Sequence, residues 1–149
     1  MATVARRLSV ALLSVVVVAA ACFGGPQRRP VGFFRLGPVA SLGQSEQTFF
    51  SESKIMLRHD QGGFFAMSTA CSYDLSPLLL VEKDGELIWR SQLSESTYAP
   101  DGSVLHGPTK NPLPYYQLNL AAGNYGGAPD TLFVKVGVER SASWRLLVP

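Results

Sequence analysis

Few side chains in this chain of 149 residues are of the types that bind metals or act as nucleophiles. Cys71 lies in the middle of the sequence, and the second cysteine, Cys22, follows an apolar N-terminal run. The two histidines, His59 and His106, do not have metal-ligand spacing to Cys71. Lone histidines are more often ordinary polar residues, so neither is expected to bind a metal.

The thiol of Cys71 is expected to be a small, partly buried group without special reactivity. A reactive thiol needs a lowered pKa, which a neighbouring cation commonly supplies. No lysine or arginine lies in the loop around Cys71. With Cys22 at the end of the leader, Cys71 is the only thiol of the folded part, so an intradomain disulfide is excluded.

Patterns typical of catalytic sites are missing from the sequence. It contains no Gly-rich phosphate loop of the usual spacing, no His-Glu-x-x-His helix and no nucleophile elbow. The acidic residues are scattered singly at expected turns. The chain is therefore not expected to be an enzyme on its own.

The N-terminal residues have the layout of a secretory leader. Arg6 and Arg7 form a basic start, residues 8–21 are almost entirely apolar, and Ala19-Ala-Ala precede Cys22. The apolar run is shorter than the roughly 20 residues of a membrane-spanning helix. Ala-Ala-Ala-Cys also resembles a bacterial lipoprotein cleavage box, which would make Cys22 the lipidated N-terminus. Ordinary signal cleavage just beyond it and an uncleaved anchor remain as alternatives.

The predicted organisation is a leader over residues 1–22, a tether over 23–30 and one domain over 31–149. The tether is rich in Gly, Pro and Arg. The leader holds two arginines and no acidic residue, which leaves eleven basic and eleven acidic residues in the remainder. A nearly neutral domain without a basic stripe is not expected to bind nucleic acid. The leader predicts export, to the periplasmic or extracytoplasmic face of a bacterial membrane.

The elements that position Cys71 are all predicted to be β-strands. Gly62-Gly63 and Lys83-Asp84-Gly85 are tight-turn signals between apolar runs, and each predicts a hairpin. No segment after the leader keeps a helical period. The sequence therefore predicts an all-β stack of small antiparallel sheets, like a sandwich or barrel. The expected strands are 31–36, 47–50, 54–59, 64–68, 78–82, 86–89, 104–105, 115–120, 131–136 and 144–148, with loops at 39–44 and 121–130.

The order of these pieces resembles the Rieske [2Fe–2S] domain of the respiratory iron–sulfur subunit type, over roughly residues 32–136. Phe65-Ala-Met-Ser-Thr-Ala-Cys71 is similar to the approach to the family's first ligand loop. Tyr98-Ala-Pro-Asp-Gly-Ser-Val104, followed by Gly107-Pro108 and Pro112-Leu113, is similar to the exit from its second. The resemblance implies a Rieske-like fold.

The residues at the family's iron-binding positions are mostly of the wrong type. The family reads Cys-x-His in its first loop and Cys-Pro-Cys-His-Gly-Ser in its second, and two Cys and two His bind the two irons. The resemblance places Cys71, Tyr73, Ser91 and Ser94 at these four positions. Of these, only Cys71 matches, so we expect no cofactor, with [2Fe–2S] implied only if the family function is retained.

The resemblance also implies that this chain lacks a disulfide that ties the two loops together in the respiratory type. In the respiratory type a second Cys pair forms a disulfide, and Ser76 and Leu93 occupy those positions here. We expect packing to hold the loops together instead. Tyr73, Leu93 and Tyr98 are expected to fill the space that a cluster would take.

These observations predict an exported, membrane-tethered Rieske-fold protein that has lost its cluster and acts as a structural or partner-binding subunit. The membrane contact would come from the leader or a lipid on Cys22, and the resemblance implies subunits of a cytochrome-containing respiratory complex as partners. Two alternatives stay open. One is a true Rieske-type electron-transfer protein with [2Fe–2S] or an atypical metal centre at Cys71. The other is a generic β-sandwich lipoprotein that binds a small ligand.

Overall fold

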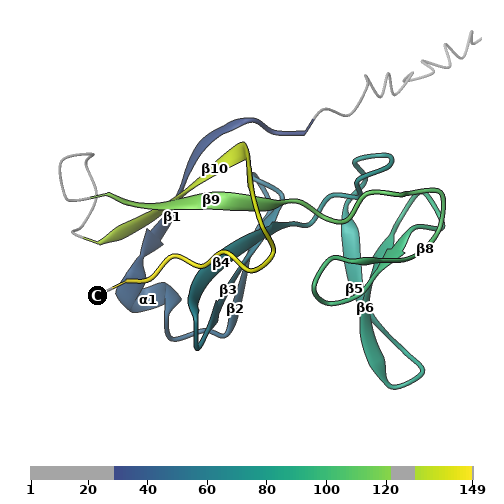
Figure 1. Cartoon of the computed structure of the whole chain (residues 1–149), viewed down its shortest axis with the longest axis horizontal. Coiled ribbons are helices and arrows are strands. Elements are labelled where there is room, and N and C mark those ends of the chain that lie inside the picture. The colour runs from purple at the N-terminus through teal and green to yellow at the C-terminus, as the bar shows by residue number, and fades with distance from the viewer. Residues whose placement is uncertain (1–28, 122–129, 149) are drawn as a thin grey trace, which may run out of the picture.

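The computed structural model describes residues 29–121 and 130–148, and these form ten strands and one short helix. The strands belong to two antiparallel sheets that lie side by side (Figure 1). The elements are β1 Gly32–Pro38, α1 Val39–Leu42, β2 Gln47–Phe50, β3 Ile55–Asp60, β4 Gly63–Ser68, β5 Leu78–Lys83, β6 Glu86–Ser91, β7 Thr97–Tyr98, β8 Val104–His106, β9 Tyr115–Ala121 and β10 Thr131–Arg140.

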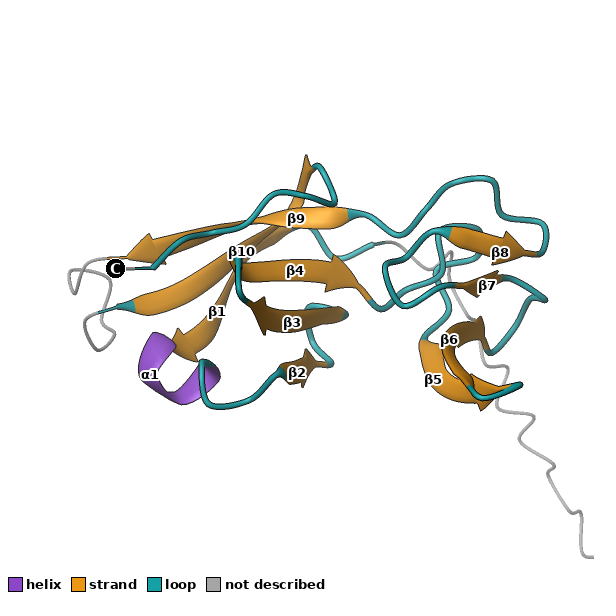
Figure 2. Ribbon diagram, turned by 60° about the horizontal axis from the view of Figure 1, so that its bottom comes forward, coloured by secondary structure: helices purple, strands orange, loops and turns teal. Residues whose placement is uncertain are grey.

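The larger sheet has the strand order β1-β10-β9-β4-β3-β2 and curls around an apolar core (Figure 2). Side chains two residues apart point to the same face of a strand, and apolar residues follow this period in four strands. The buried members on this face are Ile55, Leu57, Phe64, Ala66, Tyr116, Leu118, Leu132, Val134 and Val136. The apolar residues whose alternation predicted these strands are therefore also the residues that form the core.

The smaller sheet, β5-β6-β7-β8, is an insertion into the larger one. The chain leaves the larger sheet after β4 and returns as β9, and these two strands pair directly through Ala66↔Tyr116 and Met67↔Tyr115. A second apolar cluster joins the two sheets, because the opposite face of β3 and β4 packs against the inserted residues. Its members are Met56, Phe65, Met67, Cys71, Leu78, Trp89, Tyr98, Leu113 and Tyr115.

The prediction of an all-β fold of small antiparallel sheets is confirmed. Residues 39–44 were expected to be a loop, and their first four residues instead form the helical turn α1, which packs Leu42 and Val39 on the core of the larger sheet. The predicted leader, Cys22, most of the tether and residues 122–129 lie outside the described residues. Within the described ranges, no helix is long and apolar enough to cross a membrane.

The prediction of a final strand over 144–148 is wrong. This segment makes only one isolated bridge, between Leu146 and Phe64, at the part of β4 that β9 leaves unpaired. Two backbone hydrogen bonds between Phe64 and Leu146 and several side-chain contacts hold the segment. The Arg145 guanidinium lies 3.9 Å from the centre of the Phe65 ring, and its Nε donates to Asp60 Oδ2 at 2.8 Å.

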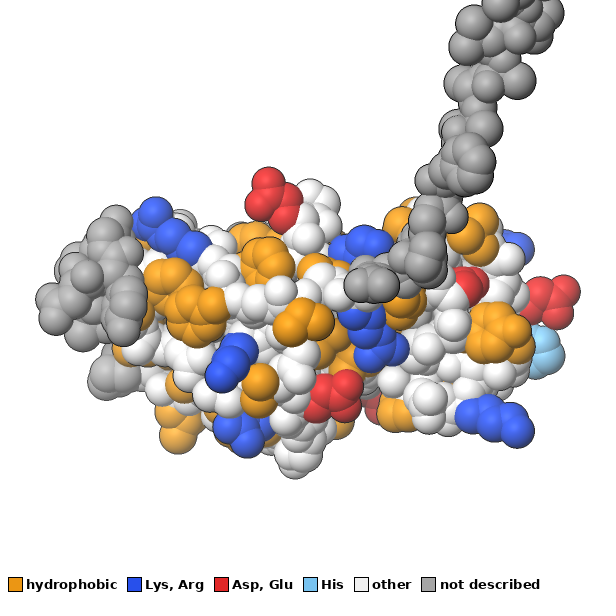
Figure 3. Space-filling model, turned by 90° about the horizontal axis from the view of Figure 1, so that it is seen from above, with side chains coloured by type: hydrophobic (Ala, Val, Ile, Leu, Met, Phe, Trp, Pro, Cys, Tyr) orange, Lys and Arg blue, Asp and Glu red, His pale blue; other side chains and the backbone are white. Residues whose placement is uncertain are grey.

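Charged side chains of both signs are interspersed on the face of the molecule drawn in Figure 3. The three ion pairs of the described residues, Arg29–Glu139, Arg58–Glu46 and Arg145–Asp60, all belong to the larger sheet and its flanks. The expectation that the protein does not bind nucleic acid stays a prediction.

Candidate functional site: two loops of the inserted sheet

The first loop, residues 70–76, connects β4 to β5 and closes on itself. The Cys71 amide donates to the Ser76 carbonyl at 2.8 Å, and the Leu75 amide donates to the Cys71 carbonyl at 3.0 Å. Ala70 and Pro77 form a bridge at the base of the loop. Leu75 adopts a φ of 60°, a left-handed conformation that costs a branched side chain about 1–2 kcal/mol. The closed loop keeps this residue in its strained conformation.

The second loop, residues 91–96, connects β6 to β7 and is organised by Ser91. The Ser91 hydroxyl oxygen accepts the backbone amides of Leu93 and Ser94 at 3.2 and 3.0 Å. The Ser91 amide donates to the Ser96 carbonyl at 2.9 Å. Gly107 backs the loop so closely that a Cβ there would lie 2.5 Å from the Ser96 Cα. Only glycine therefore allows this approach.

The structure brings Cys71 of the first loop against residues of the second loop and β7. Its Sγ lies 3.3 Å from the Tyr98 hydroxyl and 3.8 Å from the Ser94 hydroxyl, and the Tyr73 amide donates to it at 3.4 Å. Cys71 is completely buried. The sulfur thus lies next to two hydroxyls and one backbone amide, although no basic side chain lies on its loop.

The pKa of the Cys71 thiol lies below its ordinary value. Burial acts to raise the pKa, but hydrogen bonds from the Tyr98 hydroxyl, from the Asp74 and Tyr73 amides and from the Ser94 hydroxyl outweigh that effect. The expectation from sequence considered only cations near the thiol. It therefore missed that neutral donors stabilise a thiolate in this loop.

The Tyr98 hydroxyl links the buried Cys71 thiol to the segment that precedes β9 of the larger sheet. Burial and the neighbouring Cys71 raise the pKa of Tyr98, so the thiol ionises before the phenol, and the phenol can then donate to the thiolate. The same hydroxyl accepts the Ser72 amide at 3.0 Å and lies 2.9 Å from the Ser72 hydroxyl. The Ser72 hydroxyl in turn lies 2.6 Å from Thr109 Oγ1 and donates to the Asn111 carbonyl at 2.6 Å.

A pair of serine hydroxyls ties the two loops together. Ser76 Oγ lies 2.8 Å from Ser91 Oγ, and the two residues are 0% and 4% exposed. The Ser91 hydroxyl also donates to the Asp74 carboxylate at 3.3 Å. Sequence reasoning had placed Ser76 opposite Leu93 and expected packing to replace a staple. The structure instead pairs Ser76 with Ser91, through hydrogen bonds.

Asp74 accepts hydrogen bonds from both loops. Burial acts to raise the pKa of this carboxyl, but bonds from the Ser76 hydroxyl and amide, from Ser94 and from Cys71 lower it to about 2. A carboxylate that accepts several such bonds is ionised throughout the physiological range. Asp74 was not among the residues singled out from the sequence, because its partners come together only in the folded loops.

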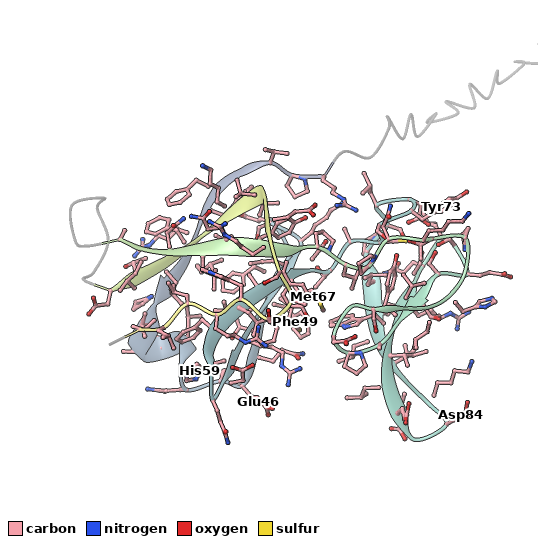
Figure 4. All side chains as sticks on the ribbon, in the orientation of Figure 1. Glu46, Phe49, His59, Met67, Tyr73 and Asp84 are labelled. Atoms are coloured by element: carbon pink, nitrogen blue, oxygen red, sulfur yellow. The ribbon has the colours of Figure 1, made fainter. Side chains whose placement is uncertain are left out.

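Two of the three side chains expected to fill the space between the loops do not lie there. Tyr73 is 61% exposed and Leu93 is 73% exposed, whereas Tyr98 is fully buried. Figure 4 shows Tyr73 at the end of the inserted sheet opposite to the β5–β6 hairpin, where Asp84 is labelled. The expectation is wrong for Tyr73 and Leu93, because small hydroxyl side chains already occupy the space and satisfy one another there.

The residues at the family's four iron-binding positions do not fit a [2Fe–2S] cluster. A cluster needs four ligand side chains of thiolate or imidazole type. Here the Ser91 and Ser94 hydroxyls are engaged within the loops, and Tyr73 lies largely in solvent. Among the residues that the structure describes, no three His, Cys, Asp or Glu side chains converge in a way that could hold a metal ion. The donor set present is one thiol and a network of hydroxyls.

Several residues of this network were missed by sequence reasoning. They are Ser96, whose hydroxyl accepts from Ser94 at 3.0 Å, Thr109, and Lys54, whose ammonium lies 3.5 Å from the Leu75 carbonyl. The recurrence of serine in both loops was the one signal available. Serine is common in ordinary loops as well, so its density alone does not identify a network.

No protein-family model matches the chain, and no curated protein matches it significantly. Among solved structures, the chain is similar to the crystal structure of the cyanobacterial plasma membrane Rieske protein PetC3 from Synechocystis PCC 6803. The match has 18% sequence identity and a TM-score of 0.44, and it covers 69% of this chain and 99% of that chain. A likeness at this level assigns neither a family nor an activity to the present chain.

Proposed function

We propose that this chain has a Rieske-type scaffold in which hydrogen-bonded polar side chains fill the space between the two former iron-binding loops. The protein then acts as a partner-binding subunit rather than as an electron carrier. The observation that carries the proposal is the meeting of the two loops. Cys71 Sγ lies 3.8 Å from Ser94 Oγ, and these residues stand at two positions that the resemblance gives to iron ligands. Hydroxyls that satisfy one another replace the other ligands.

The exposed side chains of the loops support a binding role for this tip of the inserted sheet. Tyr73 and Leu93 project from the first and second loop, and both are more than half exposed. Exposed aromatic and aliphatic residues on rigid supports are common anchors of protein interfaces. The hydrogen-bond network beneath them keeps the two loops fixed. The proposed partner is a subunit of a cytochrome-containing membrane complex, which is the partner class that the family resemblance implies.

The sequence of the leader supports a location for this subunit outside the cytoplasm. Arg6-Arg7, the apolar residues 8–21 and the Ala-Ala-Ala-Cys box are the features of an exported lipoprotein. Attachment through a lipid on Cys22 would hold the domain at the membrane surface, where a partner complex could meet it. Mass spectrometry of the protein from its native membranes tests this placement through the mass of the N-terminal peptide.

Iron and sulfide analysis of the purified chain tests the loss of the cluster. We expect no stoichiometric iron or sulfide and no visible absorption after anaerobic reconstitution, because three of the four ligand side chains are replaced. The matched variant Tyr73→His/Ser91→Cys/Ser94→His restores the ligand types at these positions. It is expected to take up iron and sulfide under the same conditions. A coloured wild-type protein would overturn the proposal, and a colourless variant would overturn the assignment of the loops.

Co-purification from native membranes tests the partner. We expect the tagged chain to carry haem absorbance with it, and the Tyr73→Ser/Leu93→Ser variant to lose most of that absorbance. The control is Leu147→Ser, which changes an equally exposed residue, 76% accessible, in the C-terminal segment. Equal haem recovery from all three proteins would exclude the loops as the docking tip.

A further inference from the structure

Strand β2 lies at the edge of the larger sheet and, among the strands that the structure describes, pairs only with β3. The His59 amide donates to the Glu46 carbonyl at 3.2 Å, which fixes the alternation of bonded pairs along the two strands. The backbone N–H and C=O groups of Thr48 and Phe50 therefore point toward β3. The backbone N–H and C=O groups of Gln47 and Phe49 point away from it, toward the free edge.

Two clefts meet along this edge. One, of about 430 Å³, is lined by Phe34, Arg35 and Glu52, together with Phe49, Phe50 and Ser51. The other, of about 330 Å³, is lined by the same three β2-edge residues together with Lys54, Leu78 and Trp89. Phe34 and Phe50 pack on the core of the larger sheet, whereas Leu78 and Trp89 belong to the cluster that joins the sheets. The two clefts thus share the Phe49–Ser51 segment, and one extends toward β1 whereas the other extends toward the inserted sheet.

Trp89 carries an unpaired polar group in the second cleft. Its residue is 2% exposed, and the indole N–H has no acceptor among the described residues. Buried donors are almost always paired, and leaving one unpaired costs about 1–3 kcal/mol. The Phe49 ring lies edge-on to the indole, 6.0 Å between ring centres, and is itself 54% exposed. Figure 4 places Phe49 between the two sheets.

We propose that the β2 edge takes up an extended polypeptide segment of a partner protein as an added strand. Strand addition satisfies the outward N–H and C=O groups of Phe49. Successive side chains of an added strand point to opposite faces, so consecutive apolar residues would enter the two clefts. A backbone carbonyl of the segment supplies the acceptor that the Trp89 N–H lacks.

The charges that line the two clefts define the chemistry of the segment. Lys54 makes no ion pair within residues 29–121 and 130–148, and it lines the cleft next to Trp89. Glu52 lies in the same turn as Lys54 but lines the other cleft, which it shares with Arg35, so that cleft is close to neutral. The segment is therefore apolar at its centre and carries an acidic residue at the end that reaches Lys54. This site does not depend on the proposed role of the two loops.

Selection from a displayed library of random nine-residue peptides tests this site on the purified full chain. We expect enrichment of peptides with an apolar centre and an acidic flank, with binding followed by tryptophan fluorescence. N-methylation of alternate amides in one register of a selected peptide should weaken binding at least tenfold, and in the other register much less. No enrichment, or equal effects in both registers, would overturn strand addition.

Variants of the protein separate backbone pairing from side-chain contact. Phe49→Ala and Phe49→Pro both remove the ring, but only proline removes the outward N–H, so the proline variant should bind a selected peptide roughly tenfold more weakly than the alanine variant. Trp89→Phe should lose roughly tenfold, which corresponds to one hydrogen bond. Leu105→Ser, at an exposed position of β8, is the control and should bind normally. A dimer that Phe49→Pro dissociates would instead identify a second copy of this chain as the occupant and overturn the partner assignment.

Discussion

The Tyr98 hydroxyl lies 3.3 Å from the buried Cys71 sulfur, within hydrogen-bond distance, and so joins the first loop to the strand that follows the second. The same oxygen accepts the Ser72 amide. One phenol therefore fixes both the thiol and the backbone beside it. The pKa of Cys71 is lowered and the pKa of Tyr98 is raised, as expected when tyrosine is the donor.

Tyr98→Phe should raise the pKa of the Cys71 thiol and lower the free energy of unfolding by about 1–3 kcal/mol, because the Ser72 amide and the sulfur both lose a buried partner. Ultraviolet titration of the thiolate and urea unfolding measure the two effects. Tyr115→Phe is the matched control, since its hydroxyl donates to the Asp101 carbonyl at 2.7 Å, away from the thiol. It should lower stability without moving the pKa of Cys71. An unchanged thiol pKa in Tyr98→Phe would contradict the assignment of tyrosine as donor.

Ser76→Ala and Ser91→Ala should each lower the free energy of unfolding by about 1–3 kcal/mol, since each removes one or more hydrogen bonds of a buried hydroxyl. The double variant should cost clearly less than the sum of the two, with a coupling of about 1 kcal/mol. Urea unfolding of the four proteins completes the cycle. Strict additivity would mean that the 2.8 Å contact does not tie the loops together in solution.

The pKa of Asp74, about 2 against an ordinary 3.8, predicts a dependence of stability on pH. The carboxylate is better stabilised in the folded state, so its contribution is fully present above pH 3.8 and is lost as the pH falls toward about 2. The pKa values of Asp60 and Asp101 are lowered as well, so the wild type loses stability through several groups. Asp74→Asn should lose less stability than the wild type between pH 3.8 and about 2, as measured by urea unfolding across this pH range. A slope equal to that of the wild type would exclude Asp74 as a contributor.

Gly107→Ala should destabilise the domain far more than Gly85→Ala, although both residues have a positive φ, of 111° and 85°. A Cβ on Gly107 would lie 2.5 Å from the Ser96 Cα, whereas a Cβ on Gly85 would meet nothing within 4 Å. We expect a loss of about 1 kcal/mol at Gly85 from backbone strain alone, and about 2–4 kcal/mol at Gly107, where overpacking adds to it. Thermal unfolding compares the two. Similar losses of stability in the two variants would show that the second loop can move away from the new methyl group without a cost in free energy.

Much of the sheet structure could be predicted from the sequence, because it depends on neighbours in the chain. Gly62-Gly63 and Lys83-Asp84-Gly85 give the two hairpins at the predicted places. The final segment, 144–148, was predicted as a strand on composition alone. Whether a strand forms there depends on a free edge of β4, which only the position of β9 determines.

The sequence by itself determined an all-β domain and the positions of Cys71, Tyr73, Ser91 and Ser94 in two loops. Apolar alternation and turn residues act within a few positions, so a linear chain displays them. Only the tertiary structure decided that Ser76 meets Ser91, that Tyr98 meets Cys71 and that Tyr73 and Leu93 face solvent. Hydroxyl and thiol hydrogen bonds depend on distance and direction between groups far apart in the chain. Such contacts exist only once both sheets have folded against each other.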